Sequence, residues 1–286
     1  MDTLTTPEAM QAWTDAAHRS GHRVALVPTM GALHEGHLAL VERARGRADR
    51  VVVSIFVNPI QFNRRDDFDR YPRTLDVDAA LCAGAGVDAI YAPSPAAMYP
   101  EGYQSHVEVA RLSEPLCGAA RPGHFRGVTT VVAKLFNAVR PDVAVFGEKD
   151  FQQLAVIRRM TADLDFGIDV VGVPTIREAD GLAMSSRNRL LSSDERQVAR
   201  CVPGALAAAA DAVGRGETRA ATVVRAASAV IAAEPRARLE YAEARDPGTL
   251  EAVDVVTGPT LLALAVWVGS VRLIDNRVLV PGRLNP

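Results

Sequence analysis

The sequence is poor in cysteine and in long apolar runs, and each shortage argues against a class of protein. Its 286 residues hold three cysteines, Cys82, Cys117 and Cys201, which are far apart and form no CxxC pair. Neither a zinc knuckle nor a disulfide framework is therefore indicated. No apolar run reaches the roughly 18 to 20 residues of a membrane helix, and the first residues do not resemble a secretory signal. We expect ordinary thiols, a cytoplasmic location and no membrane association.

A strong excess of charge of either sign is also missing. The formal net charge of −2 at pH 7 argues against a dedicated nucleic-acid binder. A hydrophobic content of 48% can supply a sizeable core, and 23% charged residues suit a soluble globular protein. The length allows one large domain or two ordinary ones.

Short β-branched runs alternate with helical stretches over residues 1–175. Runs typical of buried parallel strands cover residues 23–29, 50–57, 87–92, 142–146 and 168–174, and helical spacing covers 36–48, 74–83, 128–138 and 150–163. This alternation predicts a doubly wound parallel α/β sheet, whose ligands bind beyond the carboxyl ends of the strands.

The alternation ends near residue 176. Ser192 to Glu195 resembles a capped helix start with an acidic first turn. Helices are expected over 204–214 and 218–233, and strands over 238–244, 260–268 and 271–275. We therefore predict a smaller α+β domain over residues 176–286. The alanine-rich helix is interpreted as close helix packing.

The most specific motif follows the first predicted strand. His34 and His37 lie three residues apart as HxGH, where the carboxyl end of a strand meets a helix N-terminus. Such a terminus offers free N–H groups and about half a positive charge, which suits phosphate. Gly31 and Gly36 let the backbone approach a ligand. No GxxxxGK[ST] motif occurs, so this is not a Walker A loop.

Two amide side chains follow the second predicted strand. Asn58 and Gln61 can hydrogen-bond an acid that carries hydroxyl groups, and Met30 and Phe62 can supply apolar walls. A proline turn with exposed amides explains the same residues without any ligand.

Charged and hydroxyl residues follow the fourth and fifth predicted strands. Lys149 lies just beyond a strand end, where its charge could contact a triphosphate, and Asp150 beside it is a plausible helix cap. Ser185, Ser186 and Arg187 could hold departing pyrophosphate. A capped surface loop is the competing interpretation of these three residues.

Two further segments are candidates for ligand binding. The run RPGHFRG, residues 121–127, has two arginines and suggests an anion or substrate loop that includes His124. Asp76 and Asp78 end an acidic run and could hold Mg²⁺, which usually reaches proteins through one or two carboxylates plus phosphates. A solvated helix face is the alternative for this run.

Together these segments resemble the pantothenate synthetase (pantoate–β-alanine ligase) family, one of the HIGH-type nucleotidylyl transferases with a Rossmann-like fold. The resemblance spans nearly the whole chain, through PTMGALHEGHLALV, FVNPIQF, RYPRTLDVD, RPGHFRGV, FGEKDFQQL, READGLAMSSRN and VRLIDN. HEGH occupies the HIGH position, and MSSR replaces the KMSKS loop of related synthetases without its lysines.

The resemblance implies that ATP and (R)-pantoate form pantoyl adenylate, which β-alanine converts to pantothenate. It implies catalytic roles for His34, His37, Lys149, Ser185, Ser186 and Arg187. The expected ATP-binding set is Pro28, Met30, Gly147, Lys149, Asp150, Met184, Ser185, Ser186 and Arg187. Pantoate is expected at Gln61 and Gln153, with Asn58 beside them, and Mg²⁺ at Asp78. The resemblance also implies a homodimer.

Other functions remain open from the sequence. Another HIGH-type nucleotidyltransferase with a different acceptor would keep the ATP site, and a nucleotide-binding regulatory module would lack turnover. A tRNA synthetase is disfavoured because no anticodon-binding domain or basic face is visible. The polar segment 63–70 is a candidate lid over the reactive adenylate.

Overall fold

The computed structural model describes residues 1–282, apart from the side chain of Asp66, and the chain forms two compact units. The first unit contains residues 1–148 and 153–174, and the second contains residues 149–152 and the chain from 175 onward. The last four residues of the predicted second domain, 283–286, lie outside the described range. Within the described range, no helix has both the length and the apolar character that crossing a membrane requires.

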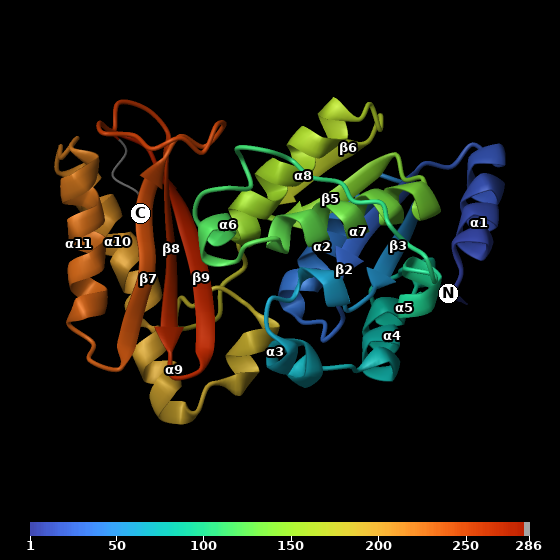
Figure 1. Cartoon of the computed structure of the whole chain (residues 1–286), viewed down its shortest axis with the longest axis horizontal. Helices are drawn as coiled ribbons and strands as arrows, with labels where there is room; N and C mark the ends of the chain where they lie inside the picture. The colour runs from blue at the N-terminus through green and yellow to red at the C-terminus, as the bar shows by residue number, and fades with distance from the viewer. Residues whose placement is uncertain (283–286) are drawn as a thin grey trace. The chain divides into compact units, whose positions relative to one another are not determined.

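The first unit is built on a six-stranded parallel sheet (Figure 1). Its strands are β1 (Asp2–Leu4), β2 (Val24–Thr29), β3 (Arg50–Ile55), β4 (Ala89–Tyr91), β5 (Val143–Gly147) and β6 (Asp169–Val173), in the order β1-β4-β3-β2-β5-β6. Its helices are α1 (Pro7–Arg19), α2 (Glu35–Arg45), α3 (Arg65–Arg70), α4 (Leu75–Gly84), α5 (Pro95–Met98), α6 (Cys117–Ala120), α7 (His124–Val139) and most of α8 (Phe151–Asp163), and η1 (Pro59–Gln61) is a 3-10 turn. The predicted doubly wound α/β fold is confirmed.

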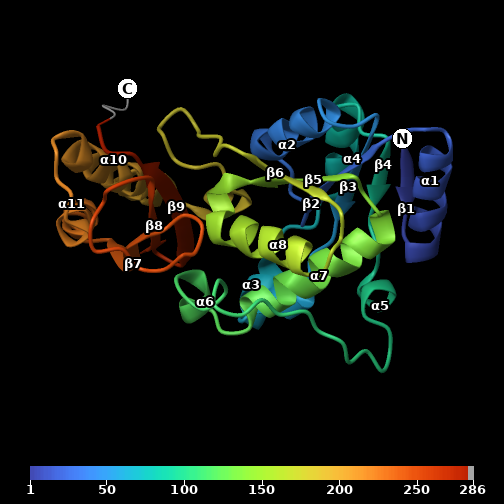
Figure 2. The ribbon, with the colours of Figure 1, turned by 90° about the horizontal axis from the view of Figure 1, so that it is seen from above.

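Helices cover both faces of this sheet (Figure 2). On one face, Leu40 and Val41 of α2 and Cys82 of α4 pack with alternate strand residues such as Val27 and Val53. Helices α7 and α8 lie on the opposite side of the sheet (Figure 2). Burial on both faces explains why the strands are almost continuously apolar.

Several local elements were not anticipated. Helix α1 begins at Pro7, and the hydroxyl of Thr6 accepts a hydrogen bond from Ala9 N at 3.2 Å, which is an ordinary N-cap. Strand β1 has only three residues and shows no usable periodicity. Most of the predicted polar lid segment 63–70 forms helix α3 rather than a loop.

The second unit has a three-stranded antiparallel sheet in the order β7-β8-β9. Its elements are η2 (Glu148–Asp150, in part), η3 (Ser186–Leu190), α9 (Ser193–Ala199), α10 (Cys201–Gly214), α11 (Ala220–Ala232), β7 (Ala237–Arg245), β8 (Thr260–Val268) and β9 (Val271–Leu279). Ser192 caps α9 in a capping box with Glu195, as the sequence predicts. Buried alanines of α10 and α11 join the core with alternate residues of β8, so close packing explains the alanine-rich stretch. The smaller α+β fold is confirmed.

Candidate active site

The histidine loop, residues 30–34, connects the carboxyl end of β2 to the start of α2. Gly31 has φ of 82° and Ala32 has φ of 52°, so two successive residues adopt the left-handed conformation. Gly31 N donates to Thr29 Oγ1 at 3.2 Å, and that hydroxyl donates to Ser54 O on β3 at 2.7 Å. The turn is thus tied to the two central strands before it reaches the histidines.

A buried carboxylate holds the backbone of the loop. Asp78, on α4, is 1% exposed and accepts hydrogen bonds from Ala32 N at 2.9 Å and Leu33 N at 2.8 Å. The hydroxyl of Thr74 donates to the same carboxylate at 3.1 Å. A Cβ added to Gly31 would lie 2.9 Å from Asp78 Oδ2, so the loop can pass this close only because position 31 is glycine.

The two histidine rings are oriented by the helix start. His34 Nδ1 accepts from Gly36 N at 3.2 Å, and His37 Nδ1 accepts from His34 N at 3.3 Å. The ring centroids lie 4.1 Å apart. Because each Nδ1 acts as an acceptor, each neutral ring carries its proton on Nε2. The pair therefore presents two Nε2–H donors at the N-terminus of α2, which itself favours anions.

The amide of Gln61 lies against the histidine loop. Gln61 Nε2 donates to Met30 Sδ at 3.0 Å, and Gln61 Oε1 accepts from Asn58 Nδ2 at 3.0 Å. Asn58 is 1% exposed, and its amide also contacts Gly127 O at 3.0 Å and the Tyr99 hydroxyl at 2.8 Å. These contacts make Asn58 a support for Gln61.

Tyr99 is a member of this network that sequence reasoning missed. Burial, and then the neighbouring Tyr103, raise the pKa of the Tyr99 phenol, which therefore stays protonated and can donate to Asn58. The two residues are 41 positions apart, and no local pattern links them.

The RPGHFRG segment contacts the backbone of Gln61. His124 Nδ1 lies 2.9 Å from Gln61 O, Arg121 Nη2 donates to the same carbonyl at 3.3 Å, and Arg121 Nη1 lies 3.2 Å from His124 Nε2. A Cβ at Gly127 would lie 2.5 Å from Ile60 O. The segment therefore fixes the turn that carries Gln61. A hollow of about 220 Å³ beside it is lined by Gln61, Asn63, His106, His124 and Arg126 among others.

Lys149 and Asp150 belong to the second unit. Lys149 Nζ lies 3.6 Å from Asp150 Oδ2, and the lysine side chain is 20% exposed. Asn276 Nδ2, on β9, donates to Lys149 O at 2.9 Å. Gly147, at the end of β5, and Gln153, on α8, belong to the first unit.

The segment after β6 carries Met184 and the Ser-Ser-Arg residues. Ser185 caps the turn η3, and its hydroxyl accepts from Arg187 N at 3.3 Å. Asn188 Nδ2 donates to Glu178 Oε1 at 2.6 Å and Ala183 O at 3.0 Å. Asn188 Oδ1 is buried without a hydrogen-bond partner in the described part of the chain, so an acceptor remains there for a ligand or a water.

An ionised cluster supports the same segment. Arg196 donates to Asp180 Oδ2 at 2.7 Å and Glu178 Oε2 at 2.7 Å. These hydrogen bonds hold the pKa of Asp180 below its ordinary value. For Glu178, burial acts to raise the pKa, and hydrogen bonds from Arg196 and Asn188 outweigh it and lower the pKa.

The acidic run does not converge on a metal position. Asp76 is exposed and Asp78 is buried, because residues two apart on a helix point to different sides. Three donors already contact the Asp78 carboxylate. Among the described residues no three His, Cys, Asp or Glu side chains gather as metal ligands. These contacts do not fit a protein-held Mg²⁺ at Asp78.

All three cysteines are free. Cys82 and Cys117 are buried. Burial raises the pKa of the Cys82 and Cys201 thiols to about 11, so both are poor nucleophiles near neutral pH.

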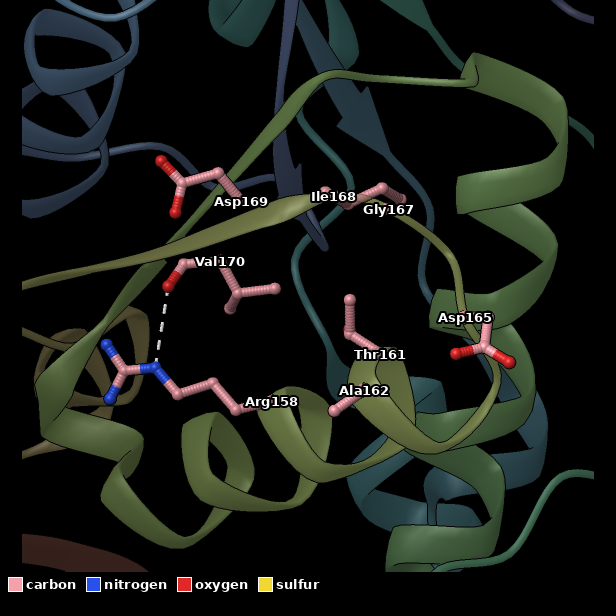
Figure 3. Close-up of a pocket in the computed structure, with 8 residues that line it drawn as sticks. All are labelled: Arg158, Thr161, Ala162, Asp165, Gly167, Ile168, Asp169 and Val170. Atoms are coloured by element: carbon pink, nitrogen blue, oxygen red, sulfur yellow. Dashed lines mark hydrogen bonds between the residues drawn. The ribbon is translucent and has the colours of Figure 1, made fainter.

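A larger hollow lies away from these loops. It measures about 600 Å³ and is lined by the end of α8 and the start of β6, including Arg158, Thr161, Asp165 and Asp169 (Figure 3). The histidine loop follows the carboxyl end of β2, whereas this hollow lies at the amino end of a parallel strand. It therefore lies at the amino ends of the strands, whereas the candidate site lies at their carboxyl ends.

The parallel sheet, with the HxGH loop at the carboxyl end of its strand β2, places the chain among the Rossmann-like α/β proteins. A sequence model described as pantoate–β-alanine ligase matches residues 2–278. The chain belongs to the pantoate–β-alanine ligase family and is an enzyme of that class, a ligase of pantothenate biosynthesis.

Individual relatives support this assignment. Pantothenate synthetases of Moorella thermoacetica and Heliobacterium modesticaldum are 53% and 56% identical, and each match covers 98% of this chain and 99% of the relative. A pantothenate synthetase structure from Thermus thermophilus has a TM-score of 0.93 at 47% identity, covering 98% of this chain and 100% of that one. The pantoate–β-alanine ligase of Francisella tularensis, complexed with β-γ ATP and β-alanine, has a TM-score of 0.80 at 31% identity, covering 97% of each chain.

Proposed function

We propose that this enzyme uses ATP to join (R)-pantoate to β-alanine, through a pantoyl adenylate, and releases AMP and pyrophosphate. The observation that carries the proposal is the contact between Gln61 Nε2 and Met30 Sδ. It joins the amide suited to an acid substrate to the loop that presents His34 and His37, within one compact unit.

In the first step a carboxylate oxygen of pantoate attacks the α-phosphorus of ATP. The bond from that phosphorus to the bridging oxygen breaks, and pyrophosphate leaves with the electron pair. The Nε2–H groups of His34 and His37 would stabilise charge developing on the phosphate oxygens. The N-terminus of α2 adds its own partial positive charge.

In the second step the amine of β-alanine attacks the acyl carbon of the adenylate. The bond from that carbon to the phosphate oxygen breaks, AMP leaves, and the new amide loses a proton to solvent. Both nucleophiles belong to substrates, so alignment and charge stabilisation can supply the catalysis without a covalent enzyme intermediate.

The remaining proposed roles follow the chemistry of each side chain. Gln61 and Gln153 would bind the hydroxyl and carboxylate groups of pantoate, with Asn58 holding Gln61 in place. Lys149, Ser185, Ser186 and Arg187 would bind the phosphates. Pro28, Met30, Gly147, Asp150 and Met184 complete the proposed ATP-binding set.

Mg²⁺ is expected to enter with ATP, because its usual ligands are phosphate oxygens, water and at most one or two carboxylates. When bound, it would neutralise phosphate charge. The contacts of Asp78 instead support the histidine loop, so no step of this proposal depends on a metal bound by Asp78.

The test measures AMP formed from ATP and Mg²⁺, with pantoate and β-alanine added together or singly. We expect AMP in a one-to-one ratio with pantothenate only when both substrates are present, and pantoate-dependent exchange of pyrophosphate into ATP without β-alanine. Nucleotide turnover that does not depend on pantoate would indicate a different acceptor, and ATP binding without turnover would indicate a regulatory module.

The expected homodimer is tested separately by light scattering.

The domain roles are also part of the proposal. Residues 1–175 would form the ATP- and pantoate-binding domain, and residues 176–286 the smaller domain. A cytoplasmic location stays a prediction, which fractionation of the producing cell would test.

A further inference from the structure

The last strand of the second unit contains a buried charge that the proposed chemistry does not use. Asp275 lies in the middle of β9, and its carboxylate is fully buried. A buried carboxylate is costly unless it is paired and hydrogen-bonded. Its retention in a strand interior therefore points to a specific partner.

That partner is Arg177. Its Nη1 donates to Asp275 Oδ2 at 2.7 Å and its Nη2 donates to Asp275 Oδ1 at 3.0 Å, so the pair is bidentate. Asp275 Oδ1 also accepts from Asn276 N at 2.8 Å, and Arg177 Nη1 also donates to Gly181 O at 3.0 Å. The ion pair is well satisfied, and it fixes the backbone at Asn276.

The side chain of Asn276 reaches a distant segment. Its Nδ2 donates to Lys149 O at 2.9 Å, across 127 positions of sequence. The four residues Lys149–Gln152 pack with the second unit although the chain on both sides of them belongs to the first. The hydrogen bond from Asn276 is a direct tie between this short segment and the sheet of the second unit.

We propose that Asn276, anchored by the Arg177–Asp275 ion pair, is a positioning residue that fixes the peptide of Lys149 and so directs its ammonium group. The inference rests on the proposed contact between Lys149 and the phosphates of ATP. Lysine has a flexible four-carbon stem, so the placement of its Cα limits where its charge can be. Charge stabilisation depends on alignment within fractions of an ångström.

Asn276→Asp tests this inference most directly, because it keeps the shape and replaces the N–H donor with a carboxylate oxygen facing Lys149 O. We expect the kcat of pantoate-dependent pyrophosphate exchange to fall by about 10- to 100-fold. The KM for pantoate should stay within about twofold of the wild-type value, because the amide side chains proposed to bind pantoate, those of Gln61 and Gln153, do not depend on this contact. Asn276→Ala should show a smaller fall in the same direction.

A double-mutant cycle separates positioning from a general effect on the fold. In a Lys149→Ala background, Asn276→Asp should cause little further loss of kcat, because the group it positions is gone. The matched control is Glu240→Gln, which breaks the Glu240–Arg272 pair in the same sheet without a link to Lys149. It should leave kcat unchanged, even where thermal stability falls.

The outcomes distinguish the two proposals. Wild-type exchange by Lys149→Ala would overturn the proposed role of Lys149 itself. If Lys149→Ala is inactive but Asn276→Asp has wild-type kcat, the positioning role is overturned. It is also overturned if Asn276→Asp loses as much in the Lys149→Ala background as alone, or if Glu240→Gln shows the same loss of kcat.

Discussion

In the histidine loop a buried carboxylate holds main-chain N–H groups, whereas the segment that carries Ser185 to Asn188 is held in addition by contacts between side chains. Asp78 accepts from two main-chain N–H groups of the loop. Asn188 is instead held by Glu178, which is paired with Arg196. Both segments are proposed to contact phosphate, but they are fixed by different chemistry.

The difference affects how each segment responds to substitutions and to pH. The carboxylate of Asp78 contacts the main chain of residues 32 and 33 directly, so the path of the loop depends on Asp78 and on the glycine that lets the chain pass. A cluster of charged side chains depends on the ionisation of each member, and therefore on pH. Substitutions can test each half of this comparison.

The largest expected effect is that of Asp78→Ala. It leaves two buried N–H groups without an acceptor, at about 1–3 kcal/mol each, and removes a buried hydroxyl partner. We expect a loss of about 3–5 kcal/mol in the free energy of unfolding, measured by urea denaturation. The exposed Asp76→Ala on the same helix is the control and should change it by no more than about 0.5 kcal/mol.

An Asp78 variant with wild-type stability would contradict this expectation. If such a variant also needed more Mg²⁺ for half-maximal pyrophosphate release, the metal role implied by the family resemblance would be the better account of Asp78.

Next in size is the effect of His37→Ala on adenylate formation. Loss of one well-placed donor to a charged transition state costs about 3–4 kcal/mol, or 10²–10³ in rate. Pantoate-dependent pyrophosphate release should fall by that factor with the fold intact by circular dichroism, and Lys149→Ala should behave alike. His18→Ala, at an exposed position on α1, is the control. Near-wild-type release by His37→Ala would remove His37 from the proposed mechanism.

Gly31→Ala should have a smaller effect on stability, about 2–3 kcal/mol. A left-handed backbone costs a non-glycine residue about 1–2 kcal/mol, and the new Cβ would press on Asp78 Oδ2 at 2.9 Å. Gly102 is the matched control, since it has a similar φ of 80° and no atom within 4 Å of an added Cβ. Thermal unfolding should show Gly31→Ala to be the more destabilising; equal losses would mean that the contact with Asp78 is unimportant.

The smallest effect expected is that of acid on the charged cluster. The pKa values of Glu178 and Asp180 are lowered from ordinary values of 4.5 and 3.8 in the folded state. Their contribution is therefore complete above these ordinary values and is lost as pH falls below them. Arg196→Gln should cost about 1–2 kcal/mol near pH 7, and the difference from wild type should shrink as the pH falls below the ordinary values of 4.5 and 3.8. A difference independent of pH would contradict the charge-based account.

The central sheet could be predicted because its buried strands are short, continuous and rich in β-branched residues. Strand β9 shows the limit of this reasoning. The prediction ended at Asp275, since a charge usually marks the end of a buried run, but the strand continues to Leu279. The charge is accommodated by Arg177, 98 positions earlier, and no local pattern reveals such a partner.

In the candidate site, too, features formed by consecutive residues could be predicted, and contacts between residues far apart in the sequence could not. The histidine loop was predictable because strand, glycine turn and helix start are consecutive in sequence. The contact of Asn58 with Gln61 is local, but its other partners, Tyr99 and Gly127, are 41 and 69 positions away and have no signal in the sequence around Asn58. Asp76 and Asp78 could have been separated from the sequence, because residues two apart cannot share one helix face.

The tie between Asn276 and Lys149 also has a consequence for protein synthesis. Domains fold as the chain emerges, amino-terminal parts first, and all six strands of the parallel sheet are synthesised before β9. A growing chain can therefore bury its histidine loop long before the anchor of Lys149 has left the ribosome. A chain that stops short of β9 would keep the HxGH loop and lack that anchor.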